Sequence, residues 1–395
     1  HAHMDHCGFI PFLYKMGFRG PVYATEPTRD ISALSSLDAI GVSFKQAKKN
    51  LFDIQDVKEM VKHTITLNWE EVTDITPDMR LTLYNSGHIL GSSMIHLNVG
   101  NGSHNFLYTG DMKYLKTRVL DPAETKCPRL ETVMIESTYG DKNAVLGSRK
   151  KAEERLVEVV EETVKKKGKI LIPVLGVGRA QELLLVIESA IREGRMKKLP
   201  VYVQGMVWDI TGIHTAYPDF LNKDLRRSIF HKDQNPFLSD VFKKVGSRKE
   251  QDAIMESNES CIIVATAGML NAGASLEYFK RMADNAKNSM IFVTYQGAGT
   301  LGRRIQDGER KIIFSDDGKA SEVEVKLNLE IITDFTGHAG RTELMQFVKD
   351  LNPRPRKILV QHGESSKCID LASSLHKANR METFAPKNLE GVRLR

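Results

Sequence analysis

The sequence is poor in cysteine and has no long apolar run. It contains only four cysteines in 395 residues, and no two of them form a C-x-x-C pair. This scatter indicates neither a disulfide framework nor a zinc ribbon. No stretch of about 18 apolar residues is present, so we expect no membrane-spanning helix. No signal peptide is visible either.

The charge balance is also modest. Lysine and arginine number 56 against 50 aspartate and glutamate residues, which gives a formal net charge of +6. Such a mild basic bias allows an RNA partner without requiring one. Hydrophobic residues make up 41% of the chain, which is enough to build cores for the two or three domains expected at this length.

The chain begins with a dense group of metal-ligand side chains. His1-Ala2-His3-Met4-Asp5-His6 places three imidazoles and one carboxylate within six residues. A zinc ion takes about four ligands, and a catalytic zinc keeps one position open for water. Four ligands this close in sequence do not readily converge on one ion. We therefore expect His1 and His3 to serve one metal, and Asp5 and His6 a second metal about 3.5 to 4 Å away.

Further ligands must come from elsewhere, and four glycine-bearing segments supply them. They carry His88, Asp111, His338 and His362, each at the end of an apolar, strand-like stretch or in the loop that follows one. The carboxyl ends of strands are where α/β folds gather their active sites. The sequence therefore predicts one site assembled from segments far apart in the chain.

In their order and composition, these segments resemble the metallo-β-lactamase superfamily, whose motifs are H-x-H-x-D-H, a lone His, a lone Asp and a distal His. Glu136 and the Gly-His-Ala-Gly turn around His338 are similar to motifs of its β-CASP branch of nucleic-acid-processing nucleases. Three further segments look closest to the archaeal homologue of the nuclease subunit of the cleavage and polyadenylation specificity factor. They are residues 204–208, 213–218 and 388–394.

The resemblance covers essentially the whole chain and implies an α/β fold. This fold is an αβ/βα metallo-β-lactamase sandwich with an inserted β-CASP domain that contains a parallel sheet flanked by helices. The expected division is 1–140 for the first part of the metallo-β-lactamase domain, 141–335 for the inserted β-CASP domain and 336–395 for the second part. Superfamily members place a strand hairpin before the first motif, so N-terminal strands are expected to be missing here. Archaeal relatives carry KH-type domains in that region.

Residue patterns agree with this division. Apolar residues near helical spacing predict a helix over residues 43–63. From about residue 148 the chain alternates between helical and strand patterns, which indicates a parallel sheet with crossover helices. The strands expected are 80–84, 94–99 and 105–108 before that point, and 169–174, 201–203, 261–264 and 289–294 after it.

The resemblance also implies a role for each motif residue. The expected zinc ligands are His1, His3 and His88 for one ion, Asp5, His6 and His362 for the other, and Asp111 as the bridge between them. Metal-activated hydroxide would attack the scissile phosphorus, and Asp5 is counted among the catalytic residues as well. His338 would protonate the leaving 3′ oxygen while Glu136 orients its imidazole. Products would carry a 5′-phosphate and a 3′-hydroxyl.

Loops of the inserted domain are candidates for contacts with RNA phosphates. The turn of residues 174–179 mimics the start of a dinucleotide fingerprint, but Gln181 stands in place of the third glycine, which disfavours a nucleotide cofactor. Backbone N–H groups at a helix start suit a phosphate, with Arg179 beside them. The loops that carry Thr266, Asn271 and Arg303 suit one equally. A tight strand–helix connection stays open for the turn, and a structural ion pair for Arg303.

The expected function is a zinc-dependent endoribonuclease in RNA 3′-end processing and transcription termination, with 5′-to-3′ exonuclease action left open. Two Zn²⁺ ions are the expected cofactors. The resemblance further implies a cytoplasmic protein that binds RNA, dimerises through its C-terminal segment, and contacts RNA polymerase and elongation factors. A catalytically inactive RNA-binding scaffold and a DNA-processing β-CASP nuclease remain alternatives. Small-molecule hydrolases of the superfamily lack a domain-sized insertion and fit less well.

Overall fold

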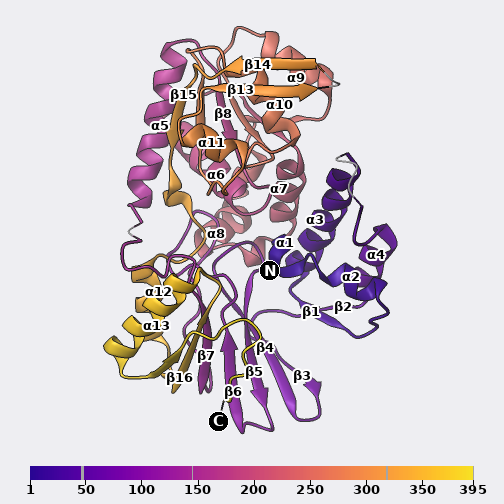
Figure 1. Ribbon diagram of the computed structural model, residues 1–395, viewed down its shortest axis with the longest axis vertical. Coiled ribbons are helices and arrows are strands. Elements are labelled where there is room, and N and C mark those ends of the chain that lie inside the picture. Colours follow the sequence, from indigo (N-terminus) through magenta and orange to yellow (C-terminus); the bar gives the residue numbers. More distant parts are fainter. Residues whose placement is uncertain (46–48, 145, 317–318, 395) are drawn as a thin grey trace. The chain divides into compact units, whose positions relative to one another are not determined.

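The computed structural model describes residues 1–45, 49–144, 146–316 and 319–394. The chain divides into two compact units, which Figure 1 shows in sequence colours. The first unit comprises residues 1–146, 219–223 and 337–395, and the second comprises residues 147–218 and 224–336. Both ends of the sequence therefore belong to the first unit. Among the described residues, every helix is too short or too polar to cross a membrane.

A seven-stranded sheet forms the centre of the first unit. Its spatial order is β17 (Glu382–Phe384), β16 (Lys357–Gln361), β7 (Thr132–Glu136), β6 (His104–Tyr108), β5 (Ser93–Val99), β4 (Met79–Asn85) and β3 (Val72–Thr76). Strands β3 to β6 pair antiparallel, whereas β6, β7, β16 and β17 run parallel. Strands β4, β6, β7 and β16 therefore point the same way, and their carboxyl ends share one edge. The strands predicted before residue 148 are confirmed as β4, β5 and β6.

Helices pack against this sheet through apolar side chains. Val133 of β7 and Ile358 of β16 belong to the same buried cluster as Phe347 of α12 (Arg341–Asp350) and Leu375 of α13 (Ser365–Asn379). Burying one such side chain stabilises a fold by about 2 kcal/mol. The remaining elements of the unit are α1 (Met4–Cys7), α2 (Ile10–Lys15), α3 (Glu26–Lys45), α4 (Ile54–Lys62) and the parallel pair β1 (Val22–Ala24) and β2 (Thr64–Thr66).

The single helix predicted over residues 43–63 is wrong. The structure has α3 reaching Lys45, a non-helical stretch at 49–53, and α4 from Ile54 onward, while residues 46–48 lie outside the described part. Asp53 explains the break, because its carboxylate accepts the backbone N–H groups of Gln55 at 2.7 Å and Asp56 at 3.3 Å. A side chain that satisfies these free donors starts a new helix.

The second unit is built on a six-stranded parallel sheet. Its order is β10 (Phe242–Val245), β9 (Val201–Gln204), β11 (Ile262–Ala265), β8 (Ile170–Pro173), β12 (Ser289–Phe292) and β15 (Asn328–Ile331). The strands predicted after residue 148 are confirmed as β8, β9, β11 and β12, and the parallel arrangement is confirmed with them. β10 and β15 were not predicted, nor was the antiparallel hairpin of β13 (Lys311–Asp316) and β14 (Lys319–Glu324).

Helices cover both faces of the parallel sheet. Ile172 of β8 packs in one cluster with Leu156 of α5 (Arg149–Lys165) and Leu184 of α6 (Arg179–Arg192). Leu171, the preceding residue, packs in another cluster with Phe279 of α10 (Gly273–Met282). This two-sided burial explains why the strands read as continuous apolar runs. The helices of the unit are α5 (Arg149–Lys165), α6 (Arg179–Arg192), α7 (Met206–Ala216), α9 (Arg248–Glu256), α10 (Gly273–Met282) and α11 (Leu301–Gln306), and α8 (Lys223–Lys232) begins at its border.

Candidate metal centre

The first four candidate ligands lie around one short helical turn. His3 has an extended backbone (φ −72°, ψ 144°) and precedes α1, whose four residues include Asp5 and His6. The backbone N–H groups of His6 and Cys7 both donate to the carbonyl of His3 at 3.0 Å, which closes the turn. This change from extended to helical backbone separates His1 and His3 from the later pair.

The remaining ligands stand at the carboxyl ends of strands. His88 follows β4, Asp111 follows β6, and His362 comes directly after β16. Because these strands end at the same edge of the sheet, residues far apart in sequence meet there. The turn before His88 requires a glycine, since Gly87 has φ +72° and a Cβ there would lie 2.5 Å from the carbonyl oxygen of Lys113.

One group of potential ligand atoms comprises His1, His3, His88 and Asp111, all within 4.8 Å of one another. Nε2 of His88 lies 3.0 Å from Nδ1 of His3, and Nε2 of His1 lies 3.4 Å from Oδ2 of Asp111. Burial lowers the pKa of His88 well below its ordinary value. The imidazole is therefore neutral at neutral pH, which is the form that binds metals.

A second group comprises Asp5, His6 and His362, again within 4.8 Å. Asp111 contacts this group too, because Nε2 of His6 lies 3.3 Å from its Oδ2 and Nδ1 of His362 lies 3.3 Å from its Oδ1. Hydrogen bonding to Asp5 raises the pKa of His362 to about 9. Asp111 thus contacts both groups, and its role as a bridging ligand stays a prediction.

The donor set fits a cation. Nε2 of His1, Nε2 of His6 and Oδ1 of Asp111 are buried and make no hydrogen bond. A buried polar atom without a hydrogen bond costs about 1 to 3 kcal/mol, so three such atoms side by side fit a bound cation that they would ligate. Imidazole nitrogens and carboxylate oxygens are the ligands that zinc takes in catalytic sites.

His338 and Glu136 lie beside these groups. Nδ1 of His338 is 3.1 Å from Oε2 of Glu136, and Oε1 of Glu136 accepts the backbone N–H of Met112 at 2.7 Å. Glu136 is fully buried, whereas the His338 side chain is 21% exposed. The ring centroid of His338 lies 4.7 Å from that of His88. A partly accessible imidazole next to the candidate ligands, oriented by a buried carboxylate, is the arrangement that general acid–base chemistry needs.

The structure thus brings all nine predicted metal and catalytic residues together within the first unit. The four predicted phosphate contacts lie in the second unit. The guanidinium of Arg179 donates to the carbonyl of Phe335, and Nε of Arg303 lies 3.0 Å from each carboxylate oxygen of Asp307. The carboxamide of Asn271 accepts the N–H of Leu301 at 3.4 Å, while Thr266 follows β11 and is half-buried.

The turn before α6 has a structural explanation. Oε1 of Gln181 accepts the N–H of Gly178 at 2.8 Å, and its Nε2 donates to the carbonyl of Gly176 at 3.1 Å. Gly178 has φ +85°, which favours glycine. Gln181 is fully buried and fills the place of the fingerprint's third glycine, so this turn packs as a strand–helix connection.

Lys113 and Glu343 were missed by sequence reasoning. Lys113 Nζ contacts Glu343 Oε1 at 2.6 Å and the carbonyl of His338 at 3.1 Å. Glu343 could have been recognised as the third residue of a helix, where a carboxylate satisfies free backbone donors. Nothing in the sequence marks Lys113 as its partner, because 230 residues separate them.

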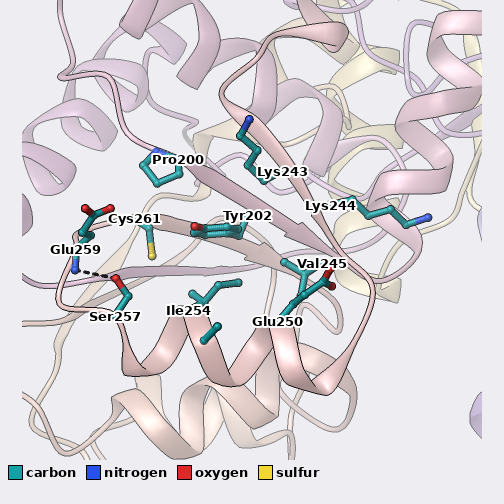
Figure 2. A pocket seen from close by; sticks show the side chains of 11 residues that line it. Pro200, Tyr202, Lys243, Lys244, Val245, Glu250, Ile254, Ser257, Glu259 and Cys261 are labelled. Atoms are coloured by element: carbon teal, nitrogen blue, oxygen red, sulfur yellow. Dashed lines mark hydrogen bonds between the residues drawn. The ribbon is translucent and has the colours of Figure 1, made fainter.

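A separate cavity of about 390 Å³ lies in the second unit, between α9 and the strands β9 and β10. Figure 2 shows Tyr202, Ile254 and Lys243 among the side chains that line it. Each group of metal-ligand side chains found among the described residues belongs to the first unit. Among the described residues, none of these groups lines the cavity, so the cavity is not a second candidate metal site.

Three family models match the chain. The metallo-β-lactamase superfamily domain matches residues 1–138, the Beta-Casp domain matches 180–305, and the Zn-dependent metallo-hydrolase RNA specificity domain matches 322–386. The third model describes its family as Zn-dependent hydrolases.

Curated relatives are similar over the whole chain. Proteins called transcription termination factor FttA are 49% identical in Pyrococcus horikoshii, 50% in Methanothermobacter thermautotrophicus and 49% in Lokiarchaeum sp.. Each alignment covers 100% of this chain but only 61% to 62% of the relative, so the chain spans about three fifths of the length of the relatives it matches.

Proposed function

Because this chain belongs to the β-CASP branch of the metallo-β-lactamase superfamily, we propose that it is a zinc-dependent ribonuclease that hydrolyses RNA phosphodiester bonds. The observation that carries this proposal is the convergence of two ligand groups on Asp111, with His338 and Glu136 beside them. A catalytically inactive scaffold has no need to keep such a complete and costly set of buried polar groups.

Two zinc ions are the proposed cofactors. One would be held by His1, His3 and His88, the other by Asp5, His6 and His362, and both by Asp111. When bound, such a pair supplies Lewis-acid chemistry: it lowers the pKa of a water molecule and offsets negative charge on phosphate oxygens. Asp5 is 66% exposed at its side chain, so it also lies where it can contact substrate.

His338 is the proposed general acid. Its Nδ1 faces Glu136, which leaves the other edge of the ring to donate a proton to the leaving 3′ oxygen. The buried carboxylate of Glu136 fixes the orientation of the imidazole. The products would carry a 5′-phosphate and a 3′-hydroxyl, because water rather than the ribose 2′-hydroxyl attacks.

Substrate contacts are proposed for Arg179, Thr266, Asn271 and Arg303 in the second unit. Each has a hydrogen-bonding side chain next to the end of a strand or the start of a helix, where backbone and side-chain donors suit a phosphodiester. The ion pair between Arg303 and Asp307 is half-exposed and can open to admit a phosphate at little cost.

The biological role proposed is RNA 3′-end formation coupled to transcription termination. It is supported by the relatives, which are called transcription termination factors. From the family resemblance we further propose a cytoplasmic protein that contacts RNA polymerase and elongation factors and forms a homodimer through its C-terminal segment. Both endonuclease and 5′-to-3′ exonuclease action are compatible with one metal centre.

The decisive experiment compares 5′-labelled RNA with single-stranded DNA of the same sequence. We expect the zinc-loaded protein to cleave RNA, and both the His338→Ala variant and a chelator to abolish cleavage. RNA cleavage that survives both changes, or products ending in a 2′,3′-cyclic phosphate, would contradict the proposal. Preferential cleavage of DNA would assign the chain to DNA processing, and binding without cleavage would assign it to a scaffold role.

A further inference from the structure

Lys113 places a positive charge in the interior of the first unit. Its side chain is only 5% exposed. An ammonium group is costly to remove from water unless new partners replace its hydration. Two partners do so: Oε1 of Glu343 at 2.6 Å and the backbone carbonyl of His338 at 3.1 Å. The Lys113 ammonium group therefore helps to hold the backbone of His338, the proposed general acid.

Glu343 holds the same turn from its other end. Its Oε1 accepts the backbone N–H of Gly340 at 3.2 Å, and its Oε2 accepts that of Tyr114 at 3.1 Å. Glu343 is also the third residue of α12, where a carboxylate satisfies free donors of the helix start. One carboxylate thus joins the loop that follows Asp111, the His338 turn and α12.

The turn is fixed at further points by the metal-site loops. Nδ1 of His88 lies 2.9 Å from the carbonyl oxygen of Gly337, and the N–H of Ala339 donates to the carbonyl of Met112 at 2.7 Å. The N–H of Met112 in turn donates to Glu136, which faces the His338 ring. Backbone, carboxylate and imidazole therefore form one connected network, to which Lys113 and Glu343 add a largely buried ion pair.

We propose that Lys113 and Glu343 are positioning residues for His338. The ion pair holds the turn of residues 337–340 against the loop after Asp111, so that the imidazole keeps its place between Glu136 and the candidate ligands. The inference rests on the proposed function in treating His338 as the acid. Displacing a reacting group by about 1 Å can cost about 100-fold in rate, so a clamp on its backbone matters for turnover.

The test compares Lys113→Met, Lys113→Arg and Glu343→Gln with the wild type in the zinc-loaded protein. A matched control is Lys326→Met, because Lys326 pairs with Glu324 at 2.8 Å but both side chains are about half exposed. The first readout is hydrogen–deuterium exchange of the backbone amides of residues 337–342, with β16 as the internal reference. The second is kcat and KM for RNA cleavage, together with zinc content.

In Lys113→Met and Glu343→Gln we expect exchange at 337–342 to become about 10-fold faster while β16 stays unchanged. We also expect kcat to fall about 10- to 100-fold, with KM changed less than about 2-fold and zinc content unchanged. Lys113→Arg should recover most of the protection, since it keeps the charge. The surface control should match the wild type.

Unchanged exchange and kcat in both charge-removing variants would overturn the proposal. Loss of zinc, or exchange in β16 that is accelerated as much as at residues 337–342, would also overturn it, because either result would mean a general structural role. If Lys113→Met does not fold, Glu343→Gln carries the test, because it keeps an oxygen that can accept the N–H of Gly340. If the wild type cleaves no RNA, the proposed function fails, and the exchange measurement alone decides whether the pair clamps the turn.

Discussion

Nδ1 of His338 lies 3.1 Å from Oε2 of Glu136, and the other oxygen of that carboxylate is held by the backbone N–H of Met112. Glu136 is fully buried at the last position of β7, so its carboxylate cannot turn away from the imidazole. A strand of the central sheet thereby sets the orientation of the partly exposed His338 ring.

Glu136→Gln should lower the cleavage rate about 10- to 100-fold. Glutamine can still accept the N–H of Met112, but it replaces the carboxylate that faces Nδ1 of His338 with an uncharged amide, so the imidazole is oriented less firmly. The measurement is kcat with labelled RNA, and zinc content is followed in parallel. Glu382→Gln, at an exposed position in β17, is the matched control. A Glu136→Gln rate equal to that of the control would remove Glu136 from the catalytic machinery.

Single ligand substitutions should remove one metal ion at a time. His88→Ala should lower the zinc content from two ions per chain to about one, and His362→Ala should do the same, because each belongs to a different ligand group. Asp111→Ala should affect both, since its carboxylate contacts both groups. Elemental analysis after dialysis measures the zinc content. The midpoint temperature of thermal unfolding should fall with each lost ion. A wild-type content of one ion would contradict two separate sites.

The candidate metal centre could be predicted from sequence because its ligands are rare residue types within short glycine-bearing segments. His88 and His362 follow apolar strands, and strands of one direction end at one edge of a sheet. The parallel sheet of the second unit was predictable for a similar reason, since strands such as β8 are buried on both faces and read as unbroken apolar runs.

Other features depend on contacts that leave no local pattern. Residues 219–223 return to the first unit, where the N–H of Asn222 donates to the carbonyl of Val119 at 2.8 Å. Lys113 and Glu343 are 230 positions apart in the sequence, and their contact also leaves no local pattern. The helix predicted over 43–63 was wrong because apolar spacing continues past Asp53, whereas the backbone follows the cap that Asp53 provides.

Arg303→Gln should weaken RNA binding and reduce its dependence on salt. If Arg303 contacts one phosphate, the slope of log affinity against log salt concentration should fall by about 1 unit. Stability should change by less than about 1 kcal/mol, because the pair with Asp307 is half-exposed. Fluorescence anisotropy at several salt concentrations measures the slope, and the control is Arg192→Gln, which removes an exposed arginine that pairs with a residue one helical turn away on α6. Equal slopes in both variants would leave Arg303 with a structural role only.

His214 should make the second unit sensitive to acid. It is 1% exposed, its Nδ1 lies 2.8 Å from the carbonyl oxygen of Ile210, and burial lowers its pKa to about 4. Between pH 6.5 and pH 4 the unfolded chain takes up a proton at this residue and the folded chain does not. The free energy of unfolding therefore decreases as the pH is lowered through that window, by about 3 kcal/mol in all.

His214→Leu removes the titrating group and should flatten this dependence, whereas His231→Leu, at an exposed position in α8, should not. Urea unfolding from pH 7 to pH 4 measures the effect. Trp208 lies in the same helix as His214 and reports on it once the only other tryptophan, Trp69, is replaced by phenylalanine. His214 belongs to the second unit and every candidate ligand to the first, so at pH 7 both variants should contain as much zinc as the wild type. A pH dependence as steep in His214→Leu as in the wild type would mean that other groups cause the acid sensitivity.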